Sequence, residues 1–135
     1  MAQTSFDIGR AAMSDALVAT LARATEYAVG QSHGIVTLEH LLLSLTEDAD
    51  AAHVLEASSV DLTRLRNDVA SFIGQQPPNA RGGQPELDPD LSKILTYAEA
   101  AARQSGRTEI NGAIVLAAIV GEGRSMAATF LKAQG

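Results

Sequence analysis

The sequence contains no cysteine and few aromatic residues. Without thiols it has no thiolate nucleophile, no disulfide and no zinc–thiolate cluster. Aromatic residues are 4% of the chain, whereas apolar residues are 46% and are mostly alanine and leucine. Alanine and leucine favour helix, and neither is a strong strand former. We therefore expect an all-α protein whose core is built from aliphatic side chains.

Positive charge is also scarce, since the formal net charge is −6 and Lys93 and Lys132 are the two lysines of the sequence. A nucleic-acid-binding protein needs a basic face that neutralises phosphates, so nucleic acid is not expected as a partner. The longest nearly apolar stretch, 113–120, is far shorter than the roughly 20 residues of a membrane span. The N-terminus lacks the basic and apolar segments of a signal peptide. These features predict a cytoplasmic protein without a membrane partner.

An internal repeat organises the sequence. Each half has the pattern of a long helix, a short polar loop, a short apolar helix and a further helix. We predict one all-α domain over 1–135 made of two pseudo-symmetric four-helix repeats, with repeat 1 over 14–73, a linker over 74–89 and repeat 2 over 90–135. Sliding one half onto the other pairs Leu21 with Leu95, Ala24 with Ala98, Thr37 with Asn111, Leu42 with Leu116 and Leu45 with Ile119.

Local signals place the ends of the helices. Gly30 is expected to end the first helix in a left-handed conformation, and Asp50 or a neighbour to begin the third. All four prolines lie within 74–89, which indicates a linker. The second repeat ends where its last helix should begin, so either the chain is a piece of a longer protein or this repeat lacks that helix. The N-caps are predicted at Ser14, Thr37, Asp61, Asp90 and Asn111.

Three runs of the sequence resemble the N-terminal domain of the Clp family of AAA+ unfoldases, and within it the ClpA type most closely. They are TLEHLLLSL at 37–45, the stretch 51–66, and SGRTEINGAIVL at 105–116. The resemblance implies an eight-helix fold with pseudo-twofold symmetry. It also implies a role in receiving substrates, or adaptors that carry substrates, for an ATP-driven unfolding ring.

The resemblance implies specific partners as well. ClpA-type domains bind the adaptor ClpS, and ClpC-type relatives bind other adaptors and phosphorylated arginine. Two positions depart from the family pattern, because Gly34 stands where an acidic residue is common and Ala113 where ClpC-like relatives have glutamate. Paired glutamates for phosphoarginine are therefore not expected, and binding to a ClpS-like adaptor would lose one contact.

Candidate partner-binding residues cluster at the start of the two short apolar helices. Glu39 has two interpretations, a carboxylate that stabilises its own helix dipole or an anchor for a basic group of an adaptor. His40 is interpreted first as a partly buried imidazole bonded to the backbone, and second as a contact at the rim of an interface. The full set of candidates is Thr37, Glu39, His40, His33, Arg107, Thr108 and Glu109.

Catalytic and cofactor motifs are missing from the sequence. The spacing of His33, His40 and His53 matches no zinc signature, and neither a P-loop nor a G-x-S-x-G elbow occurs, so we expect no metal, no cofactor and no enzyme activity. The predicted function is the recruitment of an adaptor (ClpS-like) or an unfolded substrate to a Clp ATPase ring, with any ATPase in a downstream domain. The alternatives are a stand-alone helical interaction or oligomerisation protein without a motor, and an unrecognised enzyme.

Overall fold

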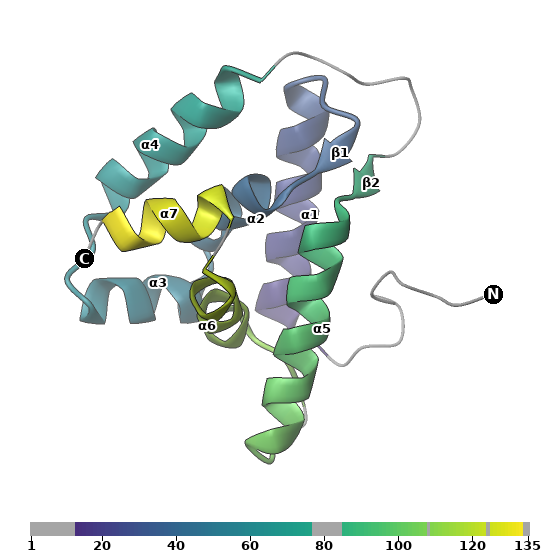
Figure 1. Cartoon of the computed structure of the whole chain (residues 1–135), viewed down its shortest axis with the longest axis vertical. Coiled ribbons are helices and arrows are strands. Elements are labelled where there is room, and N and C mark those ends of the chain that lie inside the picture. The colour runs from purple at the N-terminus through teal and green to yellow at the C-terminus, as the bar shows by residue number, and fades with distance from the viewer. Residues whose placement is uncertain (1–12, 77–84, 108, 124, 134–135) are drawn as a thin grey trace.

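A computed structural model describes residues 13–76, 85–107, 109–123 and 125–133, and this part of the chain is mainly helical (Figure 1). It confirms the predicted fold class. The first repeat has four helices, and the described part of the second has three. The elements are α1 (Asp15–Gly30), β1 (Ile35–Val36), α2 (Leu38–Leu45), α3 (Ala49–Ala57), α4 (Leu62–Gly74), β2 (Glu86–Leu87), α5 (Pro89–Gln104), α6 (Gly112–Glu122) and α7 (Met126–Ala133).

Two hydrogen bonds show the pseudo-symmetry directly. The backbone N–H of Ser14, the N-cap of α1, donates to the carbonyl of Ile110 over 2.8 Å, and the N–H of Asp88, the N-cap of α5, donates to the carbonyl of Val36 over 2.9 Å. Ser14 lies 74 positions before Asp88, and Ile110 lies 74 positions after Val36, so the second bond is the first with the two repeats exchanged. In each case the start of a long helix is bound to the residue that precedes the short apolar helix of the other repeat.

The same exchange forms the small sheet of the fold. β1 and β2 pair in parallel, with Ile35 opposite Glu86 and Val36 opposite Leu87. A single parallel bridge between Met13 and Ile110 stands at the equivalent place. β2 lies inside the segment 74–89, which the sequence predicted as a linker. The strand was not predicted because pairing with a distant segment leaves no local signal in the sequence.

Four of the predicted N-caps are confirmed, at Ser14, Thr37, Asp61 and Asn111. The prediction at the second long helix was wrong. Asp88 rather than Asp90 caps α5, and Pro89 follows as the first helical residue, where its fixed φ is favourable and its missing N–H costs nothing.

The third helix begins at Ala49, a neighbour of Asp50, as predicted. Asp48 is its N-cap, and Oδ1 of Asp48 accepts hydrogen bonds from the N–H groups of Asp50 and Ala51, both over 3.0 Å. Oδ2 of Asp48 accepts a bond of 2.7 Å from the hydroxyl of Thr20 on α1, and the Asp48 side chain is buried. Both oxygens of this buried carboxylate therefore have hydrogen-bond partners, one set in its own helix and one on α1.

The end of α1 corrects another expectation. Gly30 is the last helical residue, and the left-handed residue is Ser32, at φ 59°. Its counterpart after α5 is Gly106, at φ 72°. The next residues, His33 and Arg107, each donate a backbone hydrogen bond of 2.8 Å back to their helix. Both loops therefore leave their helices through the same left-handed turn.

All the described helices contribute to the core, and α2 runs through its centre (Figure 1). Every residue of α2 except Glu39 is buried. Burying one such leucine contributes roughly 1.5–3 kcal/mol, so the leucine stripe accounts for much of the stability. Within the described residues, no helix is both long enough and apolar enough to cross a membrane. The fully buried large side chains include Leu17, Leu41, Leu42, Leu45, Leu65, Leu91, Leu95 and Ile119.

Candidate protein-binding site

The predicted residues at the start of α2 lie together in a small pocket. The N-cap Thr37 accepts, through Oγ1, a hydrogen bond of 3.4 Å from the backbone N–H of His40. In return the backbone N–H of Thr37 donates to Nδ1 of His40 over 3.0 Å. This is a capping box in which histidine takes the place of the usual glutamate or glutamine. The reciprocal bonds fix the orientation of the imidazole ring.

The two buried histidines then form a chain of hydrogen bonds. Since Nδ1 of His40 is an acceptor, its Nε2 carries the proton and donates to Nδ1 of His33, 3.0 Å away. Nε2 of His33 in turn donates to the carbonyl of Gln76, just beyond α4, over 3.3 Å. With the protons placed in this way, the two hydrogen bonds connect α2, the loop after α1 and the end of α4. No group of three metal-ligating side chains comes together in the described parts of the chain.

His40 is neutral at physiological pH. Burial in the pocket, assisted by the neighbouring His33, lowers the pKa of His40 from 6.5 to about 4. A protonated ring would need to donate from Nδ1, where it now accepts from the Thr37 N–H. The structure therefore supports the first interpretation of His40, a buried imidazole bonded to the backbone.

The carboxylate of Glu39 connects the two repeats. Its Oε2 accepts a hydrogen bond of 3.2 Å from the backbone N–H of Ala127, in the first turn of α7. Burial raises the pKa of Glu39, although hydrogen bonds from Ala127, from its own N–H and from Thr37 act in the opposite direction. Glu39 therefore stabilises the N-terminus of α7 as well as lying in the first turn of α2. The sequence could not show this contact, because its two ends are 88 residues apart.

The pocket around these side chains has a volume of about 170 Å³. The end of α4 closes one side of it, with Phe72 and Ile73, and Phe72 also stacks edge-on against Phe130 of α7, at 5.6 Å between ring centroids. The side chains of the predicted cluster are thus bonded to one another and partly covered by α4. The lining comprises His33, Ile35, Thr37, Glu39, His40, Phe72, Ile73, Gln76 and Asp88.

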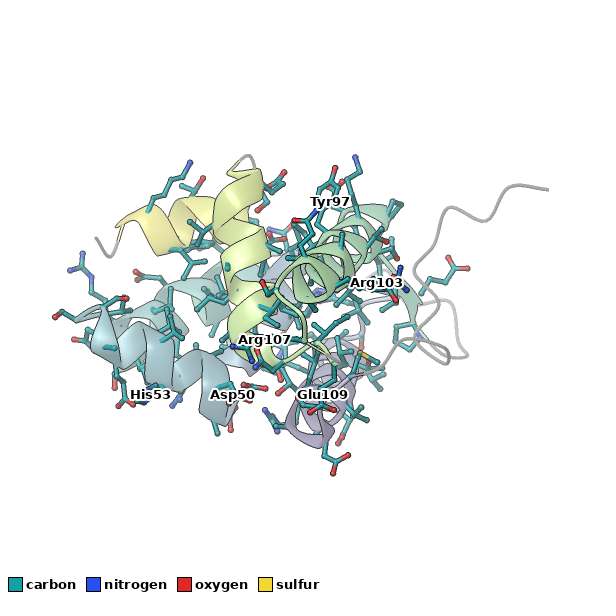
Figure 2. All side chains as sticks on the ribbon, turned by 90° about the horizontal axis from the view of Figure 1, so that it is seen from below. Asp50, His53, Tyr97, Arg103, Arg107 and Glu109 are labelled. Carbon is teal, nitrogen blue, oxygen red and sulfur yellow. The ribbon has the colours of Figure 1, made fainter. Side chains whose placement is uncertain are left out.

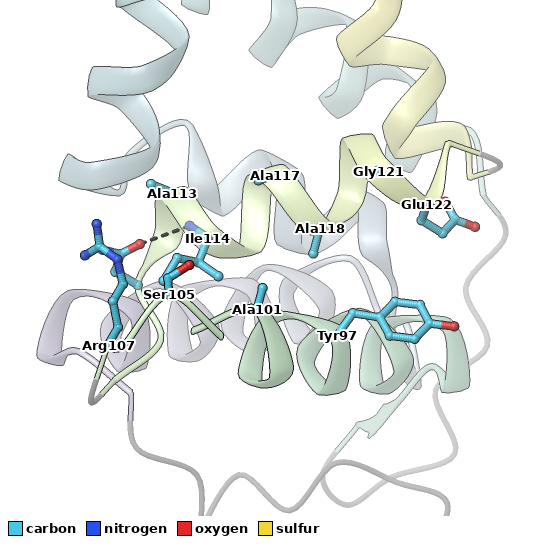
Figure 3. Close-up of a pocket in the computed structure, with 11 residues that line it drawn as sticks. Tyr97, Ala101, Ser105, Arg107, Ala113, Ile114, Ala117, Ala118, Gly121 and Glu122 are labelled. Atoms are coloured by element: carbon cyan, nitrogen blue, oxygen red, sulfur yellow. Dashed lines mark hydrogen bonds between the residues drawn. The ribbon is translucent and has the colours of Figure 1, made fainter. Parts of the chain in front are cut away.

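A larger and more open groove lies between α5 and α6 (Figure 3). Its volume is about 510 Å³. Small residues of α6 line one side, and Tyr97, which is 52% exposed, lies on the α5 side. We call this surface the α5–α6 groove; its lining is Tyr97, Ala101, Ser105, Arg107, Asn111, Ala113, Ile114, Ala117, Ala118, Gly121 and Glu122.

The second set of predicted residues lies beside this groove rather than beside Glu39. Arg107 is exposed and lines one end of the groove, and Glu109 is exposed in the loop before α6. Figure 2 shows both side chains at the surface of the molecule. Thr108 lies outside the described residues. The six described candidates therefore lie in two separate places, one in each repeat.

Comparison with known proteins identifies the family. The model of the Clp repeat (R) N-terminal domain matches residues 12–134. The chain belongs to the Clp N-terminal domain family. A ClpA homolog protein from Fuscovulum blasticum is 36% identical over 125 residues, which cover 90% of this chain and 16% of that protein. The resemblance found in the sequence is confirmed, and the chain spans only a small part of the length of this relative.

Solved structures of Clp N-domains share the fold. The N-terminal domain (1–163) of the ClpV1 ATPase from the E. coli EAEC Sci1 T6SS gives a TM-score of 0.78 at 21% identity, over 90% of this chain and 80% of that one. A complex of the ClpV N-domain with a VipB peptide gives a TM-score of 0.74 at 22% identity, over 91% of this chain and 79% of that one. At these identities the comparison demonstrates a common Clp N-domain fold.

The sequence does not predict the α5–α6 groove. Its principal residues, Tyr97, Ala101, Ala117 and Gly121, carry no recognisable motif. One signal was available, since α6 is apolar on nearly all sides, including faces that remain exposed at Ala117 and Val120. A helix with this composition normally has neighbours on every side.

Proposed function

We propose that this chain is a protein-binding module that recruits adaptor proteins or substrates to a Clp-type ATP-dependent unfoldase. Membership of the Clp N-terminal domain family supports the proposal. The observation that carries it is the α5–α6 groove, an open and largely apolar surface of about 510 Å³. Concave apolar surfaces with a few charged groups at their rim are suited to binding another polypeptide.

The related N-domain of ClpV has been solved in complex with a VipB peptide, and this supports a peptide or a protein as the ligand. We assign direct contact with the partner to the α5–α6 groove and its rim, including Arg107 and the exposed Glu109. Thr108 is included among the proposed contacts from the sequence alone. We assign a supporting role to the pocket at the start of α2, whose hydrogen bonds hold α2, α4 and α7 in place. The residues concerned are Thr37, Glu39, His40 and His33. A basic group of the partner would reach Glu39 at the carboxylate oxygen that does not accept from Ala127.

The charge of the chain narrows the class of partner. With a formal net charge of −6, the chain attracts proteins that carry a basic docking surface, and this attraction weakens as salt rises. A ClpS-like adaptor is the specific partner that we propose. The ATPase would belong to another domain, and the complex would work in the cytoplasm.

A domain exchange tests the proposal. The chain is placed at the N-terminus of a ClpA-type ATPase whose own N-terminal domain has been removed, and adaptor-dependent degradation of a model substrate is measured in the presence of ATP. We expect the exchange to restore adaptor-dependent degradation. The ATPase without any N-terminal domain is the control.

Degradation that stays at the level of this control, with an assembled and ATP-hydrolysing ring, would contradict the proposed function. Binding of the isolated chain to the adaptor, measured by calorimetry at low and high salt, tests the electrostatic part separately. An affinity that does not change with salt would contradict the role assigned to net charge.

A further inference from the structure

Two arginines line one pocket in the first repeat. The pocket has a volume of about 200 Å³, and Arg23 lines it from α1 and Arg66 from α4. One acidic residue, Glu47, also lines it, just beyond the end of α2. The sequence as a whole has 16 acidic residues against 10 lysines and arginines. The charged side chains of this pocket therefore have a balance opposite in sign to that of the chain.

The guanidinium group of Arg23 is held in a fixed position. Its Nη2 donates to Oγ1 of Thr20 over 3.0 Å and to the carbonyl of Ser44, on α2, over 3.3 Å. Its Nε is buried and has no acceptor among the described residues. No carboxylate of these residues forms an ion pair with Arg23 either. Partial burial of a cation without a counterion costs free energy, which an anion in the pocket would offset.

Arg66 keeps most of its hydrogen-bond donors available. Its Nε donates to Oγ1 of Thr46 over 3.3 Å, and its two Nη groups have no acceptor in the described part of the chain. Glu47 follows Thr46 directly, yet within this part of the chain it forms no ion pair with Arg66 or with Arg23. The carboxylate that the chain itself supplies thus leaves both cations unpaired.

We propose that the pocket between α1, α2 and α4 binds a phosphate group through Arg23 and Arg66. The site goes beyond the proposed function, because it belongs to the first repeat and shares no lining residue with the α5–α6 groove. A guanidinium group can donate two parallel hydrogen bonds to a phosphate, and a tetrahedral phosphate has oxygens for two such groups at once. Its charge of about −1.5 to −2 near pH 7 also balances two cations, whereas a carboxylate carries a single charge.

The same group is presented by inorganic phosphate and by a phosphorylated side chain of a partner protein. The first probe is inorganic phosphate, titrated into the isotopically labelled full chain at pH 7.5, with chloride keeping the ionic strength constant. Backbone amide signals and the side-chain Nε–H signals of the arginines are followed by NMR. We expect saturable shifts of the Nε–H signals of Arg23 and Arg66 and of the amides around Ser44.

Arg66→Gln should weaken phosphate binding about tenfold, because it removes charge-assisted hydrogen bonds from an exposed side chain that the core does not need. The matched control is Arg64→Gln, which removes the same charge from an exposed position of α4 outside the pocket and should bind as the parent does. Glu47→Gln should act in the opposite direction and strengthen binding about twofold, because it removes a like charge from beside the ligand.

A second titration uses a short peptide that contains phosphoserine and distinguishes the two sources of the group. Tighter binding of this peptide than of inorganic phosphate supports the site with a phosphorylated partner as the source. Equal or weaker binding of the peptide supports the site with the free ion as the source. Acetate at the same ionic strength should cause no saturable shift.

Shifts that increase linearly with phosphate, without saturation, would show an adventitious ion only and would overturn the proposal. Equal binding by Arg66→Gln and Arg64→Gln would overturn it as well, as would acetate binding as tight as that of phosphate. None of these outcomes bears on the domain exchange, because Arg66 lies outside the α5–α6 groove.

Discussion

Lowering the pH is expected to destabilise the fold through His40. Its pKa lies at about 4 in the folded chain and at the ordinary 6.5 in the unfolded chain. The unfolded state therefore binds a proton first as the pH falls, and stability that is present above pH 6.5 is lost between about pH 6.5 and 4. At pH 5 the loss relative to pH 7.5 amounts to about 2 kcal/mol from this one group.

The variant His40→Gln isolates this effect, because glutamine can still accept from the N-cap N–H in a capping box but does not titrate. Urea unfolding followed by circular dichroism at pH 7.5 and pH 5 gives the free energies of unfolding. We expect the pH-dependent loss to be about 2 kcal/mol smaller in His40→Gln than in the parent chain. His53→Gln, at an exposed position of α3, is the matched control and should behave as the parent. An unchanged pH-dependent loss in His40→Gln would refute the assignment.

Three further predictions concern stability and are checked by urea or thermal unfolding. Gly112→Ala should cost about 2 kcal/mol because the added Cβ collides with the side chain of Asp48, whereas Gly121→Ala in the same helix meets open space and should be neutral or stabilising; similar losses in both would contradict the close approach. Glu39→Ala should cost about 1 kcal/mol by removing the acceptor at the start of α7, and Glu39→Gln should cost less because its amide oxygen still accepts; equal effects would contradict the role as a cap. Ser32→Gly should stabilise the fold by about 1 kcal/mol because it relieves a left-handed backbone, and a loss of stability would show that the Ser32 side chain is needed there.

Local chemistry explains which parts of the fold could be predicted from the sequence. The caps at Thr37 and Asn111 were found because a side-chain acceptor before an apolar run satisfies backbone N–H groups that have no other partner. The cap of α5 was misplaced because Asp88 and Asp90 both flank Pro89, and the pairing of Asp88 with Val36 that distinguishes them joins distant segments. The left-handed turn was assigned to a glycine by statistical preference, and the chain uses Ser32 instead.

The candidate site was predictable only in part, for the same reason. The sequence placed His40 three residues after the cap Thr37 and indicated a backbone bond, which the structure shows. The bond from Ala127 to Glu39 crosses between the repeats and leaves no trace in the spacing of residues. The α5–α6 groove depends on a helix that covers one repeat and is not seen over the described part of the other. This difference emerges when the two halves are compared in three dimensions.

We propose that the face between α5 and α6 is the protein-binding surface of the chain. Hydrogen–deuterium exchange of the full chain, alone and with a saturating ClpS-like adaptor, tests it most directly. We expect slower exchange in α5 around Ala101 and in α6 around Ala117, with little change in α1. Slower exchange confined to α1 and α4, with α5 and α6 unaffected, would contradict it.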